Sequence, residues 1–477
     1  MIPVASLDAA MLLAESPEMP LHNLGVLIFE PAPGTAAHSY DAVRRMFEAS
    51  VPGVPAFRRR LVQDPLGLGD LRWMEDPHFD LGRHLLRATL PAPAGAAELA
   101  AFVASFAEGL LDRDKPLWEI VVVEGLATRE LALVAKIHHA AMDGLHLSAT
   151  LDTLFDRGSD DTRERLALEP WAPEADPGVR RLMIDAARML AAKPRTLARA
   201  LAGVAGAVLR SRRSRPMSVR APRKPKQFAV PPTPWSGALT VHRTVAFCEV
   251  SLAHLRAIAT AHGVTVNDVV LAASAGSLRR WLLARGALPD SPLVANVPIA
   301  VKRAGQAGAG NQISMLRIHL PTQEPCPALR LARIHTETQR GKSHHRASGA
   351  NPYFRLAELA LAATVPALLT RLVHFYSRHR GADFHPALWN VVVSNVPGPQ
   401  HELYCAGARL TGVYPYGPVQ HGSALNLTVM SISDSLCLGV LACPEKVANL
   451  GDIALGFSDE VALLRDSAPH AAQFTSR

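Results

Sequence analysis

Cysteine is scarce in this chain of 477 residues, which contains only five. Their number is odd, and no two of them form a Cys-x-x-Cys motif. This pattern argues against a disulfide framework and fits a reducing compartment. The histidines and cysteines also lack the ligand spacing of familiar structural zinc sites.

Long hydrophobic runs are absent as well. The most apolar window, residues 359–369, has about half the length that a bilayer span needs, and it contains Pro366. The first eight residues lack the basic and apolar regions of a secretory signal peptide. We therefore expect no transmembrane helix, no signal peptide and a cytoplasmic location.

Charged residues are few, since they make up 19% of the chain against 48% hydrophobic residues. This balance is typical of a globular protein with a large core. Because the length exceeds that of one ordinary core, two domains of roughly 200 residues are expected.

The net charge of +8 is concentrated in one segment. Residues 180–226 contain fourteen Lys and Arg against a single acidic residue, so this segment carries +13. Its first part, up to residue 213, has a helical pattern that Pro194 is expected to interrupt, and the Pro-rich residues 214–234 indicate a linker. The predicted organisation is an N-terminal domain (1–175), a basic helical connector with a Pro-rich linker (176–236) and a C-terminal domain (237–477).

Three interpretations of the basic segment stay open. It can be a solvated helix face followed by a linker. It can also be a surface for the anionic inner leaflet of a membrane, where each basic residue gains roughly 1 kcal/mol. Nucleic-acid binding is least favoured, because the arginines have neither interleaved aromatic residues nor a binding-fold signature.

Both halves of the sequence alternate between strand and helix patterns, which favours an α/β or α+β fold. Apolar and β-branched runs predict strands at 24–29, 73–80, 119–124, 131–137, 242–252, 390–396, 423–433 and 436–442, the last two as a hairpin. Helical spacing predicts helices at 7–13, 99–110, 145–155 and 253–262. A further helix is expected after Thr265, which is its predicted N-cap, with Asp268 completing a weak capping box.

The most informative stretch ends a predicted strand with two adjacent histidines. Successive strand residues point to opposite faces, so His138 and His139 cannot both face one site if the strand persists. One imidazole can then transfer protons, while Asp143 and Gly144 in the following turn brace it and let the backbone double back. On spacing alone two other readings stay open: both histidines can be hydrogen-bonded core residues, or His139, Asp143 and His146 can bind a metal.

Five motifs in order resemble those of one family. Residues 138–144 match the HHxxxDG signature of the acyl-CoA-dependent acyltransferase superfamily, which includes chloramphenicol acetyltransferase and the condensation domains of peptide synthetases. The other four are Pro116-Leu117-Trp118-Glu119, Asn267-Asp268-Val269-Val270-Leu271-Ala272, Ser394 to Pro399, and Leu425-Asn426-Leu427-Thr428-Val429 to Gly439. Their order and spacing resemble the bacterial wax ester synthase/diacylglycerol acyltransferases, including the actinobacterial triacylglycerol synthases, nearly end to end.

The resemblance implies a fold and an activity. The fold would be two chloramphenicol-acetyltransferase-like α/β domains joined by a helical connector, with a tunnel between them that opens to acyl-CoA on one side and to the alcohol on the other. The activity would be transfer of a long-chain acyl group from acyl-CoA to diacylglycerol or a fatty alcohol, giving triacylglycerol or wax ester. CoA is a substrate there, so neither a metal nor a bound cofactor is implied. Such an enzyme would sit at the inner membrane face or on lipid droplets.

The resemblance also implies roles for single residues. His139 would be the general base, with His138 as packing support, and Asp143 would either orient the imidazole or hold the turn. Asn267, at a helix start, is the candidate oxyanion donor, although a helix-terminus role is equally consistent with its position. Further candidate substrate-binding residues within the motifs are Gly144, Asp268, Ser394 and Asn395. One departure is visible: relatives often have an aspartate where this chain has Cys443-Pro444, which puts any role of that acid in doubt.

Two alternatives compete with this function. The chain can be a condensation-type acyltransferase that uses a carrier-protein thioester, although no carrier or adenylation domain accompanies it. It can also be a non-catalytic protein of lipid bodies or membrane surfaces that uses its basic helix, although the intact His139, Asp143 and Asn267 argue against this.

Overall fold

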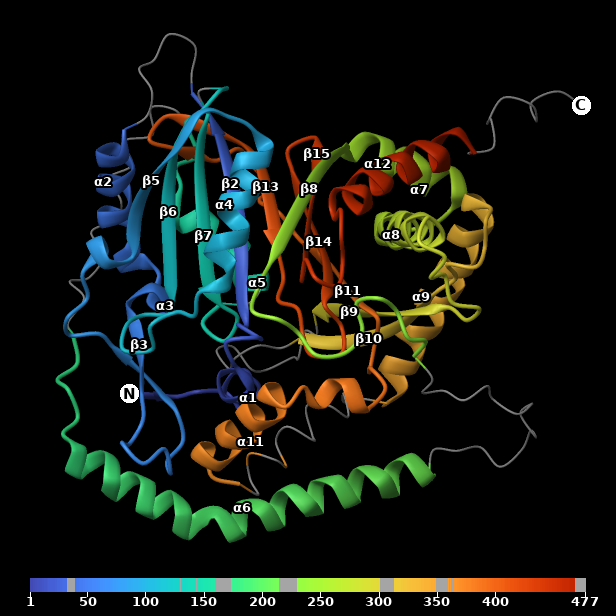
Figure 1. The fold of residues 1–477 in the computed structure, drawn as a ribbon. Coiled ribbons are helices and arrows are strands. Elements are labelled where there is room, and N and C mark those ends of the chain that lie inside the picture. Colours follow the sequence, from blue (N-terminus) through green and yellow to red (C-terminus); the bar gives the residue numbers. More distant parts are fainter. Residues whose placement is uncertain are drawn as a thin grey trace, which may run out of the picture.

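The protein is built around two six-stranded sheets that stand side by side (Figure 1). The structure is a computed structural model, and it describes residues 1–31, 39–128, 130–142, 144–158, 173–213, 230–300, 313–348, 359, 361 and 364–467. Helices cover the outer faces of both sheets, and a long helix lies across one end of the molecule. The predicted α/β class is confirmed.

The first sheet combines strands from both halves of the sequence. Its order is β12-β13-β2-β7-β6-β5. The strands are β12 (Tyr404–Cys405), β13 (Ala408–Tyr416), β2 (His22–Glu30), β7 (Leu131–His138), β6 (Trp118–Leu126) and β5 (Leu85–Ala94). Strand β2 pairs antiparallel with β7 on one side and with β13 on the other. No strand was expected at 408–416, and its place in this sheet means that the N-terminal sheet is completed by the C-terminal half.

The second sheet has the order β10-β9-β11-β14-β15-β8. The strands are β10 (Ile313–Leu320), β9 (Leu293–Ala300), β11 (Val391–Val396), β14 (Leu425–Ile432), β15 (Ser435–Ala442) and β8 (Thr244–Ser251). Strands β14 and β15 form the predicted hairpin, with Ile432 opposite Ser435. A small third sheet of the described residues consists of β1 (Ile2–Pro3), β4 (Arg72–Glu75) and β3 (Arg59–Val62).

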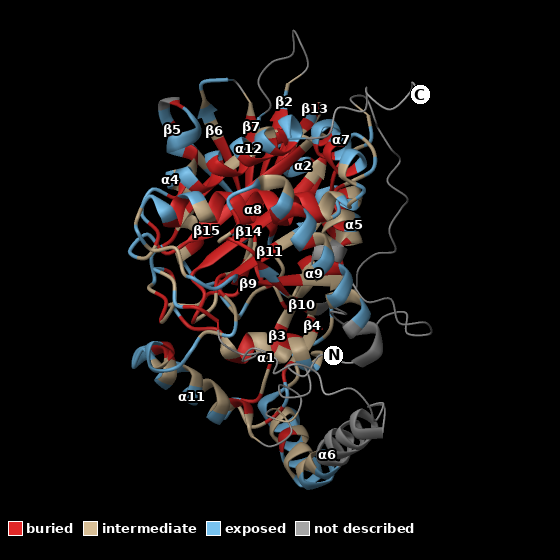
Figure 2. Ribbon diagram, turned by 90° about the vertical axis from the view of Figure 1, so that its right-hand side faces the viewer, coloured by how far each residue is buried: buried red, intermediate tan, exposed pale blue. Residues whose placement is uncertain are grey.

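Helices pack on both sheets. They are α1 (Ser6–Ala14), α2 (Tyr40–Ser50), α3 (Pro55–Arg58), α4 (Ala96–Glu108), α5 (Gly144–Leu154), α6 (Val179–Arg213), α7 (Leu252–His262), α8 (Val266–Leu283), α9 (Pro327–Ser348), α11 (Pro366–Arg378) and α12 (Gly451–Asp466). Short 3-10 turns are η1 (Val51–Gly53), η2 (Leu81–Arg83) and η3 (Gly381–Phe384). Figure 2 shows that buried residues concentrate in the sheets and α8, whereas α11 and residues 179–198 of α6 are mostly intermediate or exposed.

The core reflects the alternation of the central strands. Leu24 and Val26 of β2 belong to a large cluster that continues through α4 into the second sheet and α8. Leu27 and Phe29 of the same strand face the opposite side, where a second cluster includes α2 and α5. That second cluster also contains Met430 of β14. The two halves of the chain therefore share both hydrophobic clusters.

Two motif glycines stand where the chain segments approach closely. A Cβ on Gly398, which follows β11, would lie 1.7 Å from the Ser431 carbonyl oxygen. A Cβ on Gly439 of β15 would lie 2.1 Å from the carbonyl oxygen of Pro415 in β13. Only glycine allows these approaches, so both positions have a packing reason for their residue type.

The connector differs from expectation at one point. Helix α6 runs from Val179 to Arg213 with Pro194 inside it, so the predicted interruption is wrong. A single proline removes only one backbone donor, and the Ala- and Leu-rich turns on both sides favour the helix. The predicted linker lies mostly outside the described residues. The division into 1–175, 176–236 and 237–477 stays a proposal, since β12 and β13 join the first sheet across it.

Candidate functional site

The two adjacent histidines lie in different surroundings at the end of β7. His138 is the last residue of the strand and is 1% exposed, whereas His139 begins the following turn and is half-buried. Because side chains alternate along a strand, His138 lies on the same face as His22 of the paired strand β2. His139 instead contacts Asn23, which belongs to the opposite face. This divergence is what the alternation predicted.

His138 is held by its backbone neighbours in one tautomer. Its Nδ1 accepts the N–H of Ala140 at 3.0 Å, so the proton of the neutral ring lies on Nε2. That Nε2 is 3.4 Å from Oε1 of Glu15. With almost no exposed surface, this imidazole can brace the turn but has no access to a ligand.

A buried carboxylate lies behind this histidine. Glu15, just after α1, is 5% exposed and lies 3.1 Å from Nε2 of His22 and 2.8 Å from the Arg113 guanidinium. Burial alone would raise the pKa of Glu15, but the close approach of His138 and His22 outweighs it and holds the pKa well below its usual range. Burial lowers the pKa of His22 to about 4, so this ring is neutral at pH 7. A neutral His22 and an ionised Glu15 thus pack behind His138, on the side of the turn away from His139.

His139 is positioned by an amide from the neighbouring strand. Nδ2 of Asn23 lies 2.7 Å from Nδ1 of His139 and donates to the Met142 carbonyl oxygen at 3.0 Å. The Met142 contact orients the amide, because turning it over would place two carbonyl oxygens against each other. In this arrangement Nδ1 of His139 accepts the second Asn23 proton, and the proton of a neutral ring lies on Nε2.

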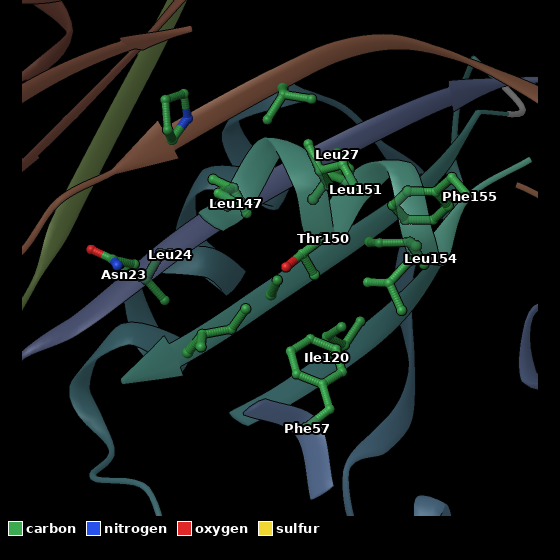
Figure 3. Close-up of a pocket in the computed structure, with 16 residues that line it drawn as sticks. Asn23, Leu24, Leu27, Phe57, Ile120, Leu147, Thr150, Leu151, Leu154 and Phe155 are labelled. Atoms are coloured by element: carbon green, nitrogen blue, oxygen red, sulfur yellow. The ribbon is translucent and has the colours of Figure 1, made fainter. Parts of the chain in front are cut away.

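An apolar cavity begins at this amide (Figure 3). It lies between the first sheet and α5, and its volume is about 60 Å³. Asn23 and Thr150 are the polar side chains of its lining, and the others are apolar: Leu24, Leu27, Phe57, Ile120, Leu133, Ala135, Ile137, Leu147, Leu151, Leu154, Phe155, Val413 and Pro415, with Gly25. Figure 3 shows Asn23 at one end and Phe155 at the other. The site therefore joins an imidazole to a slot that suits a hydrocarbon chain.

The motif Pro116-Leu117-Trp118-Glu119 supports the strand that carries the histidines. Trp118 is 1% exposed, stacks on Phe57 at 4.2 Å and on His84 at 4.6 Å between ring centroids, and donates from Nε1 to the Phe57 carbonyl. The carbonyl of Leu117 accepts the backbone N–H of His138 at 3.0 Å. These contacts are architectural.

The second-half candidates lie at the start of α8. Thr265 and Asp268 form the predicted capping box, and Asn267 lies half-buried in the first turn, where backbone N–H groups lack helical partners. Asp268 is completely buried, and its carboxylate accepts from Thr265, from Thr338 at 2.7 Å and from His335 at 2.9 Å. These bonds tie α8 to α9, so we propose that Asp268 positions Asn267 instead of contacting substrate.

The remaining motifs lie where the second sheet meets the first. Ser394 is half-buried and Asn395 is exposed near the end of β11. Val396 packs against the cluster that contains Leu151 of α5. Nδ2 of Asn426 donates to the Pro418 carbonyl, which fixes the chain after β13. The Sγ of the buried Cys443 lies 3.5 Å from the Arg243 guanidinium.

Two candidates of the turn fall outside the described part of the chain. These are Asp143 and the side chain of His146, whereas Gly144 is the first residue of α5. Within the described part of the chain, no group of three His, Cys, Asp or Glu side chains gathers as a metal site would require. The alternative reading of His139, Asp143 and His146 as metal ligands includes two groups outside the described residues.

Sequence reasoning missed three residues around the histidines: Glu15, His22 and Asn23. A signal for them existed, because all three are polar residues that flank the apolar run of β2 within ten positions of each other. Nothing in the local pattern relates them to a motif more than a hundred residues away, and only the β2–β7 pairing brings them together.

Comparison with known proteins agrees along the whole chain. Residues 4–270 match the family "Wax ester synthase/diacylglycerol acyltransferase catalytic domain", and residues 309–465 match "WS/DGAT C-terminal domain". A Mycobacterium tuberculosis (strain H37Rv) protein named "Putative diacyglycerol O-acyltransferase" is 33% identical over 468 residues, which cover 96% of this chain and 88% of that protein. A protein of the same name from Mycobacterium bovis is 32% identical over 476 residues, 97% of this chain and 90% of its own.

Solved structures give the same fold. The wax ester synthase/diacylglycerol acyltransferase from Marinobacter aquaeolei VT8 is similar with a TM-score of 0.68 and 26% identity, covering 98% of this chain and all of that one. The starter condensation domain of rhizomide synthetase, in complex with C8-CoA and Leu-SNAC, has a TM-score of 0.55 and 17% identity, covering 98% and 95%. At that identity the second likeness shows the fold alone, a two-sheet α/β fold of the condensation-domain and chloramphenicol-acetyltransferase type.

Proposed function

The chain belongs to the wax ester synthase/diacylglycerol acyltransferase family, and from this premise we propose that it moves a long-chain acyl group from acyl-CoA to diacylglycerol or a fatty alcohol. One observation carries the proposal most directly. The imidazole of His139 stands beside Asn23, at the polar end of a cavity whose walls are otherwise almost entirely apolar. An acyl thioester has the same polarity pattern, with a reactive carbonyl at one end of a hydrocarbon chain.

In the proposed reaction His139 takes the proton of the acceptor hydroxyl as its oxygen attacks the thioester carbonyl. A carbon–oxygen bond forms, the carbon–sulfur bond breaks, and the protonated imidazole returns the proton to the departing CoA thiolate. An imidazole suits both steps because it changes charge near neutral pH. No covalent acyl-enzyme is needed.

The Asn23 amide constrains this cycle. For Nε2 of His139 to accept a proton, the neutral ring must carry its other proton on Nδ1. Asn23 can then accept that proton only through its Oδ1, which requires the amide to turn over and give up its bond to Met142. We therefore include the Asn23 amide in the proposed proton transfer as a positioning group.

The tetrahedral intermediate also needs hydrogen-bond donors. Asn267 and the first turn of α8 are the candidates, since Asp268 and its bonds to α9 hold this helix start in place. Asp143 remains proposed as the group that orients His139 or holds the turn. Gly144, Ser394 and Asn395 remain proposed contacts of the substrates.

The cavity under α5 is the proposed acyl site. Its apolar walls come from one face of the first sheet and from α5, which contributes Leu147 and Leu151. Displacement of these side chains from the sheet would lengthen the site for a long acyl chain. We therefore expect α5 to control the length of the chain that is accepted.

The direct test offers labelled palmitoyl-CoA with hexadecanol and dioleoylglycerol side by side, and separates the products by thin-layer chromatography. We expect labelled wax ester, triacylglycerol or both. His139→Ala should lose about a hundredfold to ten-thousandfold in rate with an unchanged melting temperature. Wild-type-like turnover of that variant would rule out the assignment of the base.

The same assay separates the two alternatives. A carrier-dependent condensation enzyme would leave free palmitoyl-CoA unused but would act on a carrier-bound acyl thioester. A non-catalytic lipid-surface protein would use neither donor, and its lipid binding would be indifferent to His139→Ala.

Membrane or lipid-droplet association is part of the proposal. None of the described helices combines the length and apolar character that a membrane span requires. The basic residues of α6, among them Arg180, Arg181 and Arg188, can instead attract anionic lipid. Diacylglycerol and long-chain alcohols reside in lipid, so the enzyme must meet a lipid surface to reach them.

A further inference from the structure

Five large apolar side chains are exposed within a short stretch of the chain. Leu368, Leu372 and Phe375 lie on α11, and Phe384 and Leu388 follow it. Phe375 is 64% exposed and Phe384 is 84% exposed. We propose that this set, called here the α11 face, is the surface by which the protein docks on an anionic lipid layer.

The helix presents these residues on one side. Leu368, Leu372 and Phe375 are spaced by four and three residues, so they form one stripe along α11. Pro366 and Ser377, which lie on the opposite side at this spacing, are buried. A short helix with an apolar outer stripe is suited to lie in the plane of a lipid interface.

The inner side of α11 fixes this orientation. The Ser377 hydroxyl lies 3.0 Å from the Ser16 hydroxyl and donates to Oε2 of Glu18 at 2.6 Å. Nε2 of His374 lies 3.1 Å from the Glu15 carbonyl oxygen. Helix α11 is therefore fastened to the segment whose Glu15 side chain supports His138, so the apolar stripe must point away from the body.

The charged residues around the α11 face favour an anionic lipid as the partner. Between residues 364 and 389 the chain has three arginines and a single acid, Asp383, which pairs with Arg380 at 2.7 Å. Arg371 and Arg378 are exposed on α11 itself. Basic residues that flank protruding apolar ones fit an anionic lipid surface, which takes up both.

A second basic helix lies at the same end of the molecule. Figures 1 and 2 both place α6 and α11 at the lower end of the fold. Nζ of Lys193 in α6 donates to the Leu361 carbonyl at 2.8 Å, which joins α6 to the residues before α11. Both helices therefore lie at the end of the molecule that is proposed to dock on lipid.

The size of the face favours lipid over a second copy of the chain. Five such side chains expose on the order of 500 Å², less than the roughly 800 Å² that each partner contributes to a standard protein interface. Insertion into a lipid layer has no such minimum area. The inference deepens the proposed function, because docking here would bring a lipid-resident acceptor to the side of the fold that carries Glu15 and His138.

The test is flotation of the full chain with vesicles of equimolar phosphatidylcholine and phosphatidylglycerol. The test variant carries Leu372→Ser and Phe375→Ser. A matched control carries Leu455→Ser and Leu463→Ser on α12, which are also exposed, at 66% and 45%, and lie at the other end of the molecule. We expect the apparent vesicle affinity of the α11 variant to fall about tenfold or more, with the control unchanged.

The outcomes are separable. Equal flotation of the α11 variant and the wild type would overturn the proposal, and so would a loss of self-association in light scattering without a loss of flotation. Acyl transfer to a short, water-soluble alcohol should be the same in the α11 variant as in the wild type, which shows that the variant is folded. If the wild type floats but transfers no acyl group to any acceptor, the docking surface stands and the proposed function fails.

Discussion

Asn23 is the residue whose chemistry most directly limits His139. Its amide bonds both the imidazole and the Met142 carbonyl, so the position of the ring and the location of its proton depend on one side chain. A histidine that serves as a base needs a partner for its second nitrogen. An amide fixed by a backbone carbonyl is a weaker partner for the protonated ring than a carboxylate would be.

Substitution of Asn23 tests this dependence. In Asn23→Asp the carboxylate would accept Nδ1–H and stabilise the imidazolium, which raises the pKa of His139. The acidic limb of the kcat/KM profile should move to higher pH by about one unit. Asn23→Leu, which keeps the size but neither donates nor accepts, should lower kcat at every pH by about tenfold or more. Superimposable pH profiles of wild type and Asn23→Asp would disprove the role.

Glu15 should make stability depend on pH. Its folded-state pKa is held below the unfolded value by His138 and His22 despite burial, so its contribution is present above the unfolded pKa of about 4.3 and is lost as pH falls through the folded value. Melting temperatures of wild type and Glu15→Gln should therefore differ at neutral pH, and the difference should shrink progressively as the pH falls below about 4.3. A difference that is constant with pH would show that the carboxylate charge is irrelevant.

At this scale the sequence was informative only where a motif exists. The divergence of His138 and His139 followed from alternation along β7 alone. Glu15, His22 and Asn23 could not be assigned, because their contacts depend on the antiparallel register of β2 against β7, and register is not visible in a single strand.

Among the elements, α8 depends on a single buried carboxylate. Asp268 caps the helix through Thr265 and bonds Thr338 and His335 of α9. Asp268→Ala would remove the common acceptor of Thr265, His335 and the buried Thr338 and would empty a completely buried position. We expect a loss of roughly 3 kcal/mol in the free energy of unfolding. Asp452→Ala, which breaks an exposed pair with Arg285, is the control and should cost about 0.5 kcal/mol or less. Denaturant titration measures both, and equal losses would refute the role.

Prediction of elements succeeded where the signal is local. Thr265 was recognised as an N-cap and the hairpin of β14 and β15 was placed correctly, because caps and turns are determined by neighbouring residues. The interruption predicted at Pro194 is wrong, because the helix-favouring residues on both sides outweigh the local cost of one proline. Strand β13 went unrecognised, since its run contains Gly412 and Pro415, both poor strand formers.

At the scale of the whole molecule, β12 and β13 from the C-terminal half complete the first sheet. We therefore predict that the first half of the chain cannot fold alone. Residues 1–236 without the rest would leave β2 as an unpaired edge and remove Leu410, Val413 and Met430 from the cluster beneath α5. We expect this fragment to aggregate or to unfold without cooperativity in circular dichroism. Co-expression with residues 237–477 should restore a soluble complex. A cooperative transition of the isolated fragment would contradict this prediction.

The position of β12 and β13 in the first sheet also limits how the protein can open for its substrates. Strand β13 pairs with β2, and its Pro415 lies against Gly439 of the second sheet. Because β13 links the two six-stranded sheets, these sheets cannot separate by a rigid-body hinge motion. Turnover should consequently follow small local displacements of α5 and of the turn that carries the histidines, and a covalent bridge between the two sheets at their far ends would leave the rate untouched.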